Sequence, residues 1–170
     1  MTIRTNKQME EYLIKTGTGI LNKTIALPFE LEQILKSEFL INNDCTILKG
    51  IHSIKEIPDV KTDIEKCELE YKENNIHPID FIEHPGSELE YLTLAVECGK
   101  KLSNRLITEF KNKKFRIIIS FNETKKEMEK IVQFGGSSVS FYNLRNGCDN
   151  KMRIKNLEEI KLEAILEIEI

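Results

Sequence analysis

The sequence predicts an α+β fold, in which a mostly antiparallel sheet carries a long helix, over about residues 87–112, packed on one face. Apolar residues recur every three or four positions in that region, as on the buried face of a helix. They are Leu89, Leu92, Ala95, Val96, Gly99, Leu102, Leu106 and Phe110. Residues 115–121 and 161–170 instead alternate apolar and polar side chains, which is typical of antiparallel strands. Such a helix and such strands bury their apolar faces against each other.

The length and composition fit one domain over residues 1–170. A chain of 170 residues can bury a core of its own, and 40% hydrophobic with 31% charged residues excludes general disorder. We expect residues 1–6 to be a flexible tail. The longest apolar run, 117–119, is far below the ~20 residues of a membrane helix, and the first residues lack the apolar core of a signal peptide. We therefore expect a cytoplasmic protein without membrane contact.

The first third of the chain predicts two helices. Asn6 is a good cap for a helix over residues 7–15, and the glycines at 17–19 end it. Pro28 suits the first position of a second helix, whose apolar stripe extends to Phe39.

The next third predicts extended structure. Residues 42–44 have turn chemistry, and a strand follows over residues 45–54. Residues 63–74 alternate apolar with charged side chains, although the spacing of some apolar residues also fits a helix face, and we favour a strand. Residues 76–82 form a further short extended segment, which its proline places at a sheet edge.

The remaining elements follow Ser87, which caps the long helix. Gly99 lies within that helix, where it costs about 1 kcal/mol relative to alanine, so we expect a close neighbour there. The helix should end in a lysine-rich last turn.

After the strand at 115–121, Thr124-x-x-Glu127 matches a capping box, which predicts a short helix carrying Met128, Ile131 and Val132 and ended by Gly135-Gly136. A strand over residues 139–144 and a turn at Asn146-Gly147 follow. In the terminal strand, Leu162, Ala164, Leu166, Ile168 and Ile170 should face the core. Lys161, Glu163, Glu167 and Glu169 should face solvent.

The four cysteines are widely separated: Cys45, Cys67, Cys98 and Cys148. They lack the C-x-x-C spacing of zinc or redox sites, and a domain of this size does not need a disulfide. We expect buried, reduced thiols.

Other chemistry is weakly supported. His77 and His84 flank Asp80 and, with Cys67 and Glu83, supply side chains of the kinds that bind metals, but no metal motif exists, and a histidine such as His52 is more often a surface group. A Cys–His pair remains conceivable because such residues need not be close in sequence. Gly135-Gly136-Ser137-Ser138 follows a predicted helix instead of preceding one, which favours a turn over a phosphate site. We therefore expect no catalytic, cofactor-binding or metal-binding residues.

Charge is distributed unevenly along the chain. Residues 1–98 contain 10 basic and 18 acidic residues, and residues 99–170 contain 15 basic and 10 acidic ones. Between Glu56 and Glu97, twelve acidic residues accompany three basic ones. The basic excess comprises Lys100, Lys101, Arg105, Lys111, Lys113, Lys114 and Arg116. Such segments are solvated faces, mutually neutralised neighbours, or docking surfaces for a partner of opposite charge.

These observations favour a non-enzymatic protein-binding module with a basic protein partner. We expect a bacterial immunity protein, of the kind found in contact-dependent growth inhibition, that neutralises a cognate toxin through an acidic surface. The candidate contact residues are Asp63, Glu65, Glu68, Glu70, Glu73, Asp80 and Glu83.

Two alternatives stay open. The first is an enzyme whose site assembles from residues distant in sequence. The second is a nucleic-acid-binding domain that uses the basic residues at 100–116, which the net charge of −3 and the absence of a recognised binding motif disfavour.

Overall fold

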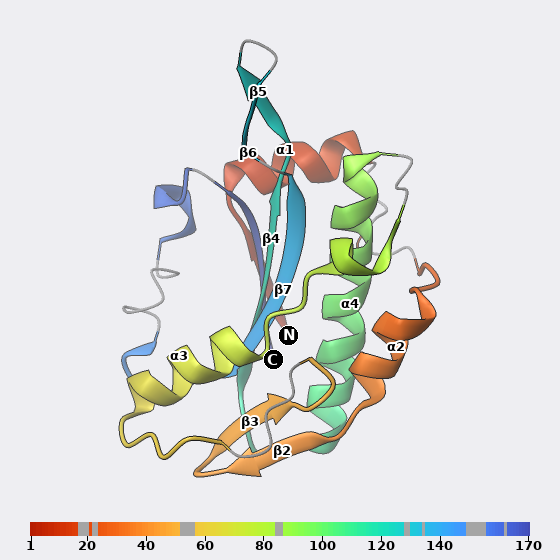
Figure 1. The fold of residues 1–170 in the computed structure, drawn as a ribbon. Coiled ribbons are helices and arrows are strands. Elements are labelled where there is room, and N and C mark those ends of the chain that lie inside the picture. The colour runs from red at the N-terminus through yellow and green to blue at the C-terminus, as the bar shows by residue number, and fades with distance from the viewer. Residues whose placement is uncertain are drawn as a thin grey trace.

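A four-stranded antiparallel sheet in the order β1-β8-β4-β7 forms the centre of the computed structural model (Figure 1). The structure describes residues 1–16, 21, 24–51, 57–83, 87–127, 130–133, 135–148, 156–161 and 163–170. In those residues the strands are β1 (Thr2–Thr5), β2 (Phe39–Asn42), β3 (Cys45–Leu48), β4 (Phe115–Asn122), β5 (Lys125–Glu127), β6 (Lys130–Gln133), β7 (Gly136–Asn143) and β8 (Ala164–Glu169). The helices are α1 (Lys7–Lys15), α2 (Phe29–Lys36), α3 (Asp63–Glu73) and α4 (Glu88–Glu109), with the 3-10 helices η1 (Pro78–Phe81) and η2 (Leu157–Glu159).

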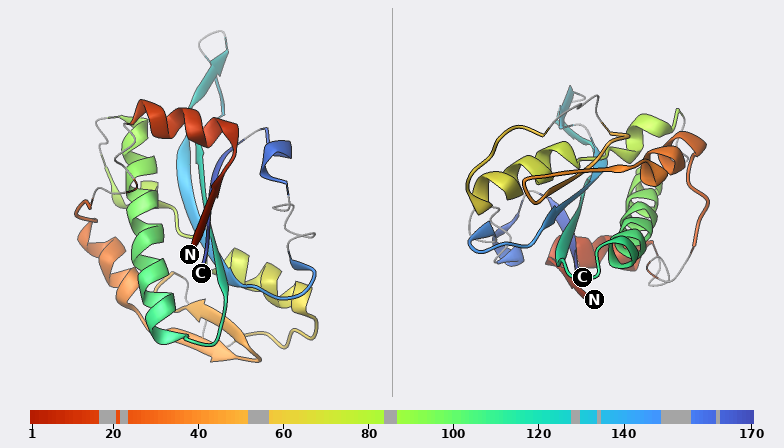
Figure 2. Two further views of the ribbon diagram at one scale, coloured as in Figure 1. Left: turned by 180° about the vertical axis from the view of Figure 1, so that it is seen from behind. Right: turned by 90° about the horizontal axis from the view of Figure 1, so that it is seen from below.

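The long helix α4 packs on one face of this sheet, which confirms the predicted fold class (Figure 2). Its apolar stripe meets the side chains of β4, β7 and β8 that point to that face, including Ile117, Phe141 and Leu166. Gly99 makes the close approach that its position predicts. A Cβ added there would lie 2.7 Å from Cδ1 of Ile119, so a larger residue would force the Ile119 side chain to shift. The helix ends at Glu109, and the lysines expected in its last turn follow it instead.

The other face of the sheet is also covered, which corrects the prediction of a half-solvated terminal strand. Cys67, Tyr142, Ile118 and Ile165 belong to a second buried cluster on that face, to which α3 contributes. Glu167, expected in solvent, is 1% exposed as a side chain. It is buried because Arg4 and Arg116 approach its carboxylate at 2.8 and 3.3 Å.

The start of the chain is ordered by the sheet, so the expected flexible tail at residues 1–6 is wrong. Thr2–Thr5 pair with Leu166–Glu169 of β8, and the Asn6 side chain caps α1 at the backbone N–H of Met9. The two ends of the chain therefore lie side by side (Figure 1).

The second predicted helix and the following turn are close to their predictions. Pro28 is the cap residue and α2 begins at Phe29. Phe39, predicted on the helix stripe, instead opens the hairpin β2–β3. Asn43 and Asp44 connect these strands with φ values of 50° and 66°, as a type I′ turn requires.

Residues 63–74 are helical, so the strand prediction is wrong there. Thr62 and Glu65 form a complete capping box: the Thr62 hydroxyl accepts from the Glu65 N–H and the Glu65 carboxylate accepts from the Thr62 N–H. Residues 76–82 also differ from the prediction. Ile76 makes a single bridge to Val139, and the 3-10 helix η1 follows at Pro78–Phe81.

The capping box predicted at Thr124 does not form. Residues 125–127 and 130–133 form the paired strands β5 and β6, and Thr124 instead hydrogen-bonds the Glu88 carboxylate at the start of α4 through its N–H and hydroxyl. The strand at β7 and the turn at Asn146-Gly147, where Gly147 has φ 84°, agree with the predictions. Some predicted features lie outside the described residues: Gly17, Gly19, residues 52–54 of the predicted strand, Met128 and Leu162.

The contact between α4 and β4 predicts large effects of truncation in the core. Leu92 and Ile117 have no exposed surface, so Leu92→Ala or Ile117→Ala should each lower the free energy of unfolding by roughly 2–5 kcal/mol in a urea titration. Ile14 on α1 is 68% exposed, and Ile14→Ala should cost under about 0.5 kcal/mol. Losses below about 1 kcal/mol at both core positions would contradict this packing.

Candidate functional site

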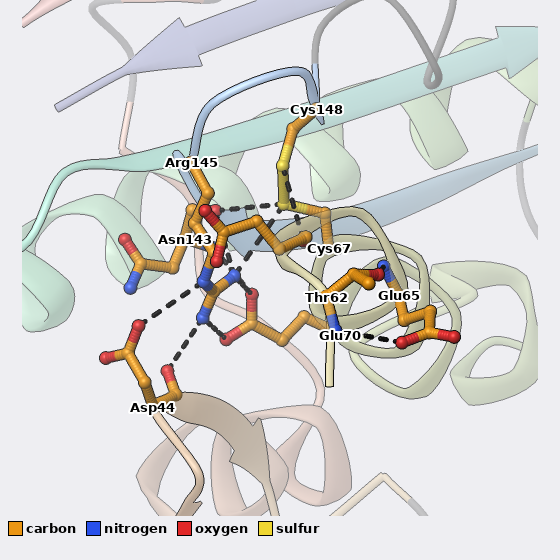
Figure 3. Close-up of a disulfide and its surroundings, with 9 residues drawn as sticks. Asp44, Thr62, Glu65, Cys67, Glu70, Asn143, Arg145 and Cys148 are labelled. Atoms are coloured by element: carbon orange, nitrogen blue, oxygen red, sulfur yellow. Dashed lines mark hydrogen bonds and ion pairs between the residues drawn. A yellow bond between two sulfur atoms is a disulfide. The ribbon is translucent and has the colours of Figure 1, made fainter. Parts of the chain in front are cut away.

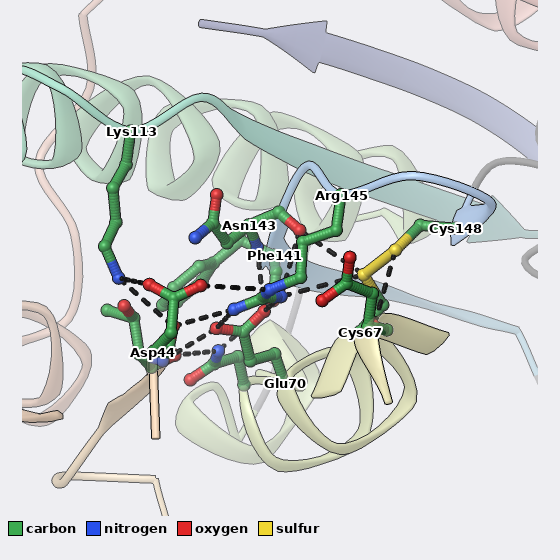
Figure 4. A network of polar contacts seen from close by, with 11 residues as sticks. Asp44, Cys67, Glu70, Lys113, Phe141, Asn143, Arg145 and Cys148 are labelled. Atoms are coloured by element: carbon green, nitrogen blue, oxygen red, sulfur yellow. Dashed lines mark hydrogen bonds and ion pairs between the residues drawn. A yellow bond between two sulfur atoms is a disulfide. The ribbon is translucent and has the colours of Figure 1, made fainter. Parts of the chain in front are cut away.

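A polar cluster lies where α3 meets the hairpin β2–β3 and the end of β7, and its centre is Glu70 (Figure 4). The Glu70 side chain has no exposed surface. Its Oε1 accepts from the backbone N–H of Thr46 at 2.7 Å and its Oε2 from that of Asn143 at 2.9 Å. One carboxylate therefore joins β3 to β7, two strands that do not pair with each other.

Arg145 neutralises Glu70 in a two-pronged ion pair. Its Nη1 and Nη2 donate to the two carboxylate oxygens at 2.6 and 3.1 Å. Its other N–H groups donate to the carbonyls of Asn143 and Asp44 and to the Asp44 carboxylate. Burial works against this charge, but the Glu70 carboxylate keeps the pKa of Arg145 above its ordinary value. The guanidinium is thus satisfied by protein groups.

Asp44 extends the cluster to the surface. Its Oδ1 lies 2.7 Å from Nζ of Lys113 and its Oδ2 lies 3.3 Å from Nε of Arg145. Burial pushes the pKa of Asp44 upward, but the two cations outweigh it and hold that pKa below its ordinary value. A shallow hollow of about 400 Å³ opens here, lined by Asp44, Asp63, Leu144, Arg145 and Asn146.

One helical turn along α3, Asn74 repeats the role of Glu70. Its side-chain oxygen accepts from the Leu48 N–H at 2.9 Å, and its amide donates to the carbonyls of Thr46 and Phe141. Since residues four apart share one helix face, α3 presents both side chains to the gap between β3 and β7. The polar side chains on this face of α3 thus supply hydrogen bonds that a strand between β3 and β7 would otherwise make. The cluster centred on Glu70 is here named the junction.

A disulfide lies against this junction, which corrects the expectation of four reduced thiols (Figure 3). Cys67 of α3 and Cys148 are joined with their sulfurs 1.97 Å apart. Arg145 Nη1 lies 3.7 Å from Sγ of Cys67. Cys45 and Cys98 are free thiols, and burial raises the pKa of each, which disfavours the nucleophilic thiolate.

The other chemical candidates do not assemble in the described part of the chain. His77 is exposed, with its Nε2 3.0 Å from the Asn75 side-chain nitrogen. His52 and His84 lie outside the described residues. Among the residues that the structure describes, no group of three histidine, cysteine or acidic side chains is placed to hold a metal ion.

The structure separates the seven acidic candidates. Asp63, Glu65 and Glu68 are exposed on the N-terminal half of α3 and are here named the acidic end of α3. Asp80 and Glu83 are also exposed, but η1 contacts α2, α4 and β7, away from that end (Figure 1). The other two differ: Glu73 is half-buried beside Lys72, and the burial of Glu70 removes it from the predicted contact surface.

The basic residues at 100–116 are largely neutralised by neighbouring carboxylates. The pairs are Lys100–Glu97, Lys101–Glu32, Arg105–Glu109, Lys113–Asp44, Arg116–Glu167 and Arg116–Glu169. Arg105 also donates to two backbone carbonyls at the end of α2 and stacks on Phe39. Lys111 and Lys114 are exposed. Most of these basic side chains therefore make ion pairs or hydrogen bonds within the fold.

Comparison with known proteins places the chain in a family. A model of the Uncharacterized protein PM0498 family matches residues 4–170, which is nearly the whole chain. The chain belongs to this family. No curated protein and no solved structure matches it. In the part of this family member that the structure describes, no helix has both the length and the apolar character needed to cross a membrane.

Sequence patterns do not identify the junction residues of this PM0498-family chain. Arg145 lies between a predicted strand and a predicted turn, Asn74 lies at the end of a predicted strand, and neither belongs to a motif. One signal was readable: Thr62 and Glu65 have capping-box spacing, which starts a helix and puts Cys67, Glu70 and Asn74 on one face.

Proposed function

We propose that the protein is a non-enzymatic binding module that takes a basic protein partner on the acidic end of α3. Within that class, we propose an immunity protein that neutralises a cognate toxin in the cytoplasm. The observation that supports the proposal is that the acidic and the basic residues differ in how far they are exposed or paired within the fold. The acidic end of α3 is exposed, whereas the basic cluster at 100–116 is mostly occupied within the fold.

The position of these carboxylates supports a role as a persistent negative surface. Asp63 and Glu65 lie in the first turn of α3, where the helix dipole favours negative charge. Hydrogen bonds from the backbone and hydroxyl of Thr62, and from the Lys61 N–H, hold the pKa of Glu65 below its ordinary value. The carboxylate of Glu65 is therefore ionised at neutral pH and well below it.

Such a negative surface acts mainly on the rate at which the protein and its partner associate. Complementary charge accelerates association and disfavours partners of the wrong sign. A toxin that cleaves nucleic acid has a cationic cleft for phosphates, and an acidic helix end that covers the cleft competes with the substrate. The same surface disfavours nucleic acid as a ligand of this protein.

Charge reversal at two positions tests the proposal. The variant Asp63→Lys/Glu68→Lys should slow association with the partner by about tenfold at low ionic strength, and the difference should shrink as salt is added. Glu65 is left unchanged because its substitution would also break the capping box. Association rates are measured at two salt concentrations with the partner encoded beside the gene or captured from the host.

The matched control is Asp80→Lys/Glu83→Lys, which changes net charge equally on another part of the surface. The control variant should bind nearly as the unmodified protein does. If the first variant stays folded and associates at an unchanged rate with an unchanged salt dependence, the acidic end of α3 is not the binding surface. Equal losses in both variants would show that net charge alone is responsible.

A further inference from the structure

The Cys67–Cys148 pair connects the acidic end of α3 to the segment after β7 (Figure 3). Cys67 lies between Glu65 and Glu68 in the sequence, and Cys148 follows the turn at Gly147, 81 residues later. Both cysteines are buried. The hollow lined by Asp63 of α3 and by Leu144, Arg145 and Asn146 lies between the same two parts of the chain.

Each sulfur also lies close to a backbone carbonyl oxygen. Sγ of Cys67 is 3.3 Å from the oxygen of Asn143, and Sγ of Cys148 is 3.7 Å from the oxygen of Asp63. A disulfide makes no use of these oxygens as acceptors, whereas a thiol S–H can donate to them. The surroundings therefore provide a hydrogen-bond acceptor near each cysteine in the reduced form, once the two sulfurs have moved apart to a non-bonded distance.

One of the two sulfurs has a cationic side chain beside it, whose charge is shared with Glu70 and Asp44. Nη1 of Arg145 lies 3.7 Å from Sγ of Cys67. A positive group beside a cysteine stabilises the thiolate, which is the form that attacks a disulfide. Arg145 is fixed there by Glu70 and Asp44, so the cation stays in place whether the disulfide is closed or open.

We propose that Cys67 and Cys148 form a reversible thiol–disulfide exchange site that controls how firmly the acidic end of α3 is held. A dithiol reductant attacks the bond, two electrons pass to the pair, and the products are two cysteine thiols and the oxidised reductant. In reverse, the Cys67 thiolate attacks a small disulfide such as glutathione disulfide. The Cys148 thiolate then attacks the Cys67 sulfur of this mixed disulfide and displaces the second glutathione, so two glutathione thiols are released in total.

The consequence for α3 follows from how its two halves are anchored. Glu70 and Asn74 bind the C-terminal half to β3 and β7 by hydrogen bonds that do not depend on the redox state. Cys67 is the covalent anchor of the N-terminal half. Reduction should loosen residues 63–68 while the rest of the fold stays in place, and regulation of binding by this route rests on the proposed function.

The experiment uses the intact chain and needs no partner. The protein is incubated without denaturant with dithiothreitol, then alkylated with iodoacetamide, and the modified cysteines are identified by mass spectrometry. We expect modification of Cys67 and Cys148 after reduction, little without reductant, and little again after treatment with glutathione disulfide. Amide hydrogen exchange in residues 63–68 should be about tenfold faster or more in the reduced protein, measured at exchange times so short that α4, which exchanges through global unfolding, is still protected in both forms.

The variant Cys67→Ser/Cys148→Ser serves as the matched control, because its exchange rates should resemble those of the reduced protein and ignore dithiothreitol. A bond that resists reduction until denaturant is added, or that does not re-form, would overturn the exchange site. Unchanged exchange at residues 63–68 after reduction would overturn control of α3. These outcomes are independent of the charge-reversal test, which measures partner binding alone.

Discussion

Glu70→Gln is expected to destabilise the fold by about 3–5 kcal/mol, since it removes the buried carboxylate of the ion pair and leaves the Arg145 guanidinium with only the half-exposed Asp44 carboxylate. The glutamine has the size of the glutamate, so the loss does not come from a cavity. Its amide nitrogen would also face N–H donors, because Thr46, Asn143 and Arg145 all donate to this carboxylate. The loss is measured as the shift in a urea unfolding curve at neutral pH.

Glu68→Gln is the matched control, with the same chemical change two residues away on the exposed side of α3. It should change the free energy of unfolding by less than about 0.5 kcal/mol. A loss below about 1 kcal/mol for Glu70→Gln would show that the junction does not depend on this carboxylate. A large loss in both variants would instead point to a general requirement for negative charge on the helix.

Loss of the disulfide should have a comparable effect. The closed loop spans 81 residues, for which the chain-entropy account gives about 4.5 kcal/mol, within the 2–5 kcal/mol seen on removing native disulfides from small domains. We therefore expect Cys67→Ser/Cys148→Ser, or dithiothreitol, to lower the free energy of unfolding measured by urea titration by that amount. Since a typical domain is stable by only 5–15 kcal/mol, the reduced protein should remain folded with a much smaller margin.

Dithiothreitol must have no effect on the double serine variant, since Cys45 and Cys98 are already thiols. This control separates the disulfide from any other action of the reductant. Identical unfolding curves with and without dithiothreitol, in protein shown by alkylation to be reduced, would contradict the expected stabilisation.

Much of the fold was readable from apolar periodicity. The pattern from Leu89 to Phe110 is long enough that only a helix satisfies it, and the 115–121 alternation likewise specifies a strand. The terminal strand was also identified, but not its surroundings. Alternation predicts which residues share a face of a strand, and it does not reveal that Arg4 and Arg116 bury Glu167 on the second face.

The incorrect predictions of secondary structure fall on short segments whose sequence fits both a helix and a strand. Cys67, Leu69 and Tyr71 alternate as in a strand, but their helix is set by the capping box at Thr62. At Thr124 the same motif failed because Glu88, 36 residues earlier in the chain, binds the threonine N–H that a helix start would need. Capping motifs are therefore informative only when no distant residue competes for the same groups.

Less of the candidate site than of the fold could be predicted from the sequence. The acidic excess on α3 was visible from composition, and three of the seven candidates lie together at its exposed end. The burial of Glu70 was not visible, since it depends on a cation 75 residues away. The disulfide likewise could not be inferred, because cysteines 81 residues apart carry no spacing signal for pairing.

The separation in sequence between Glu70 and Arg145 also determines when their ion pair can form during protein synthesis. At roughly 5–20 residues per second, Arg145 leaves the ribosome about 4–15 s after Glu70. Over that interval β2, β3 and α3 have emerged, but β7 has not, so Glu70 and Asn74 have no second strand to bind. The N-terminal half of the protein therefore cannot finish folding on the nascent chain before its last third arrives, and its acidic helix is solvated until then.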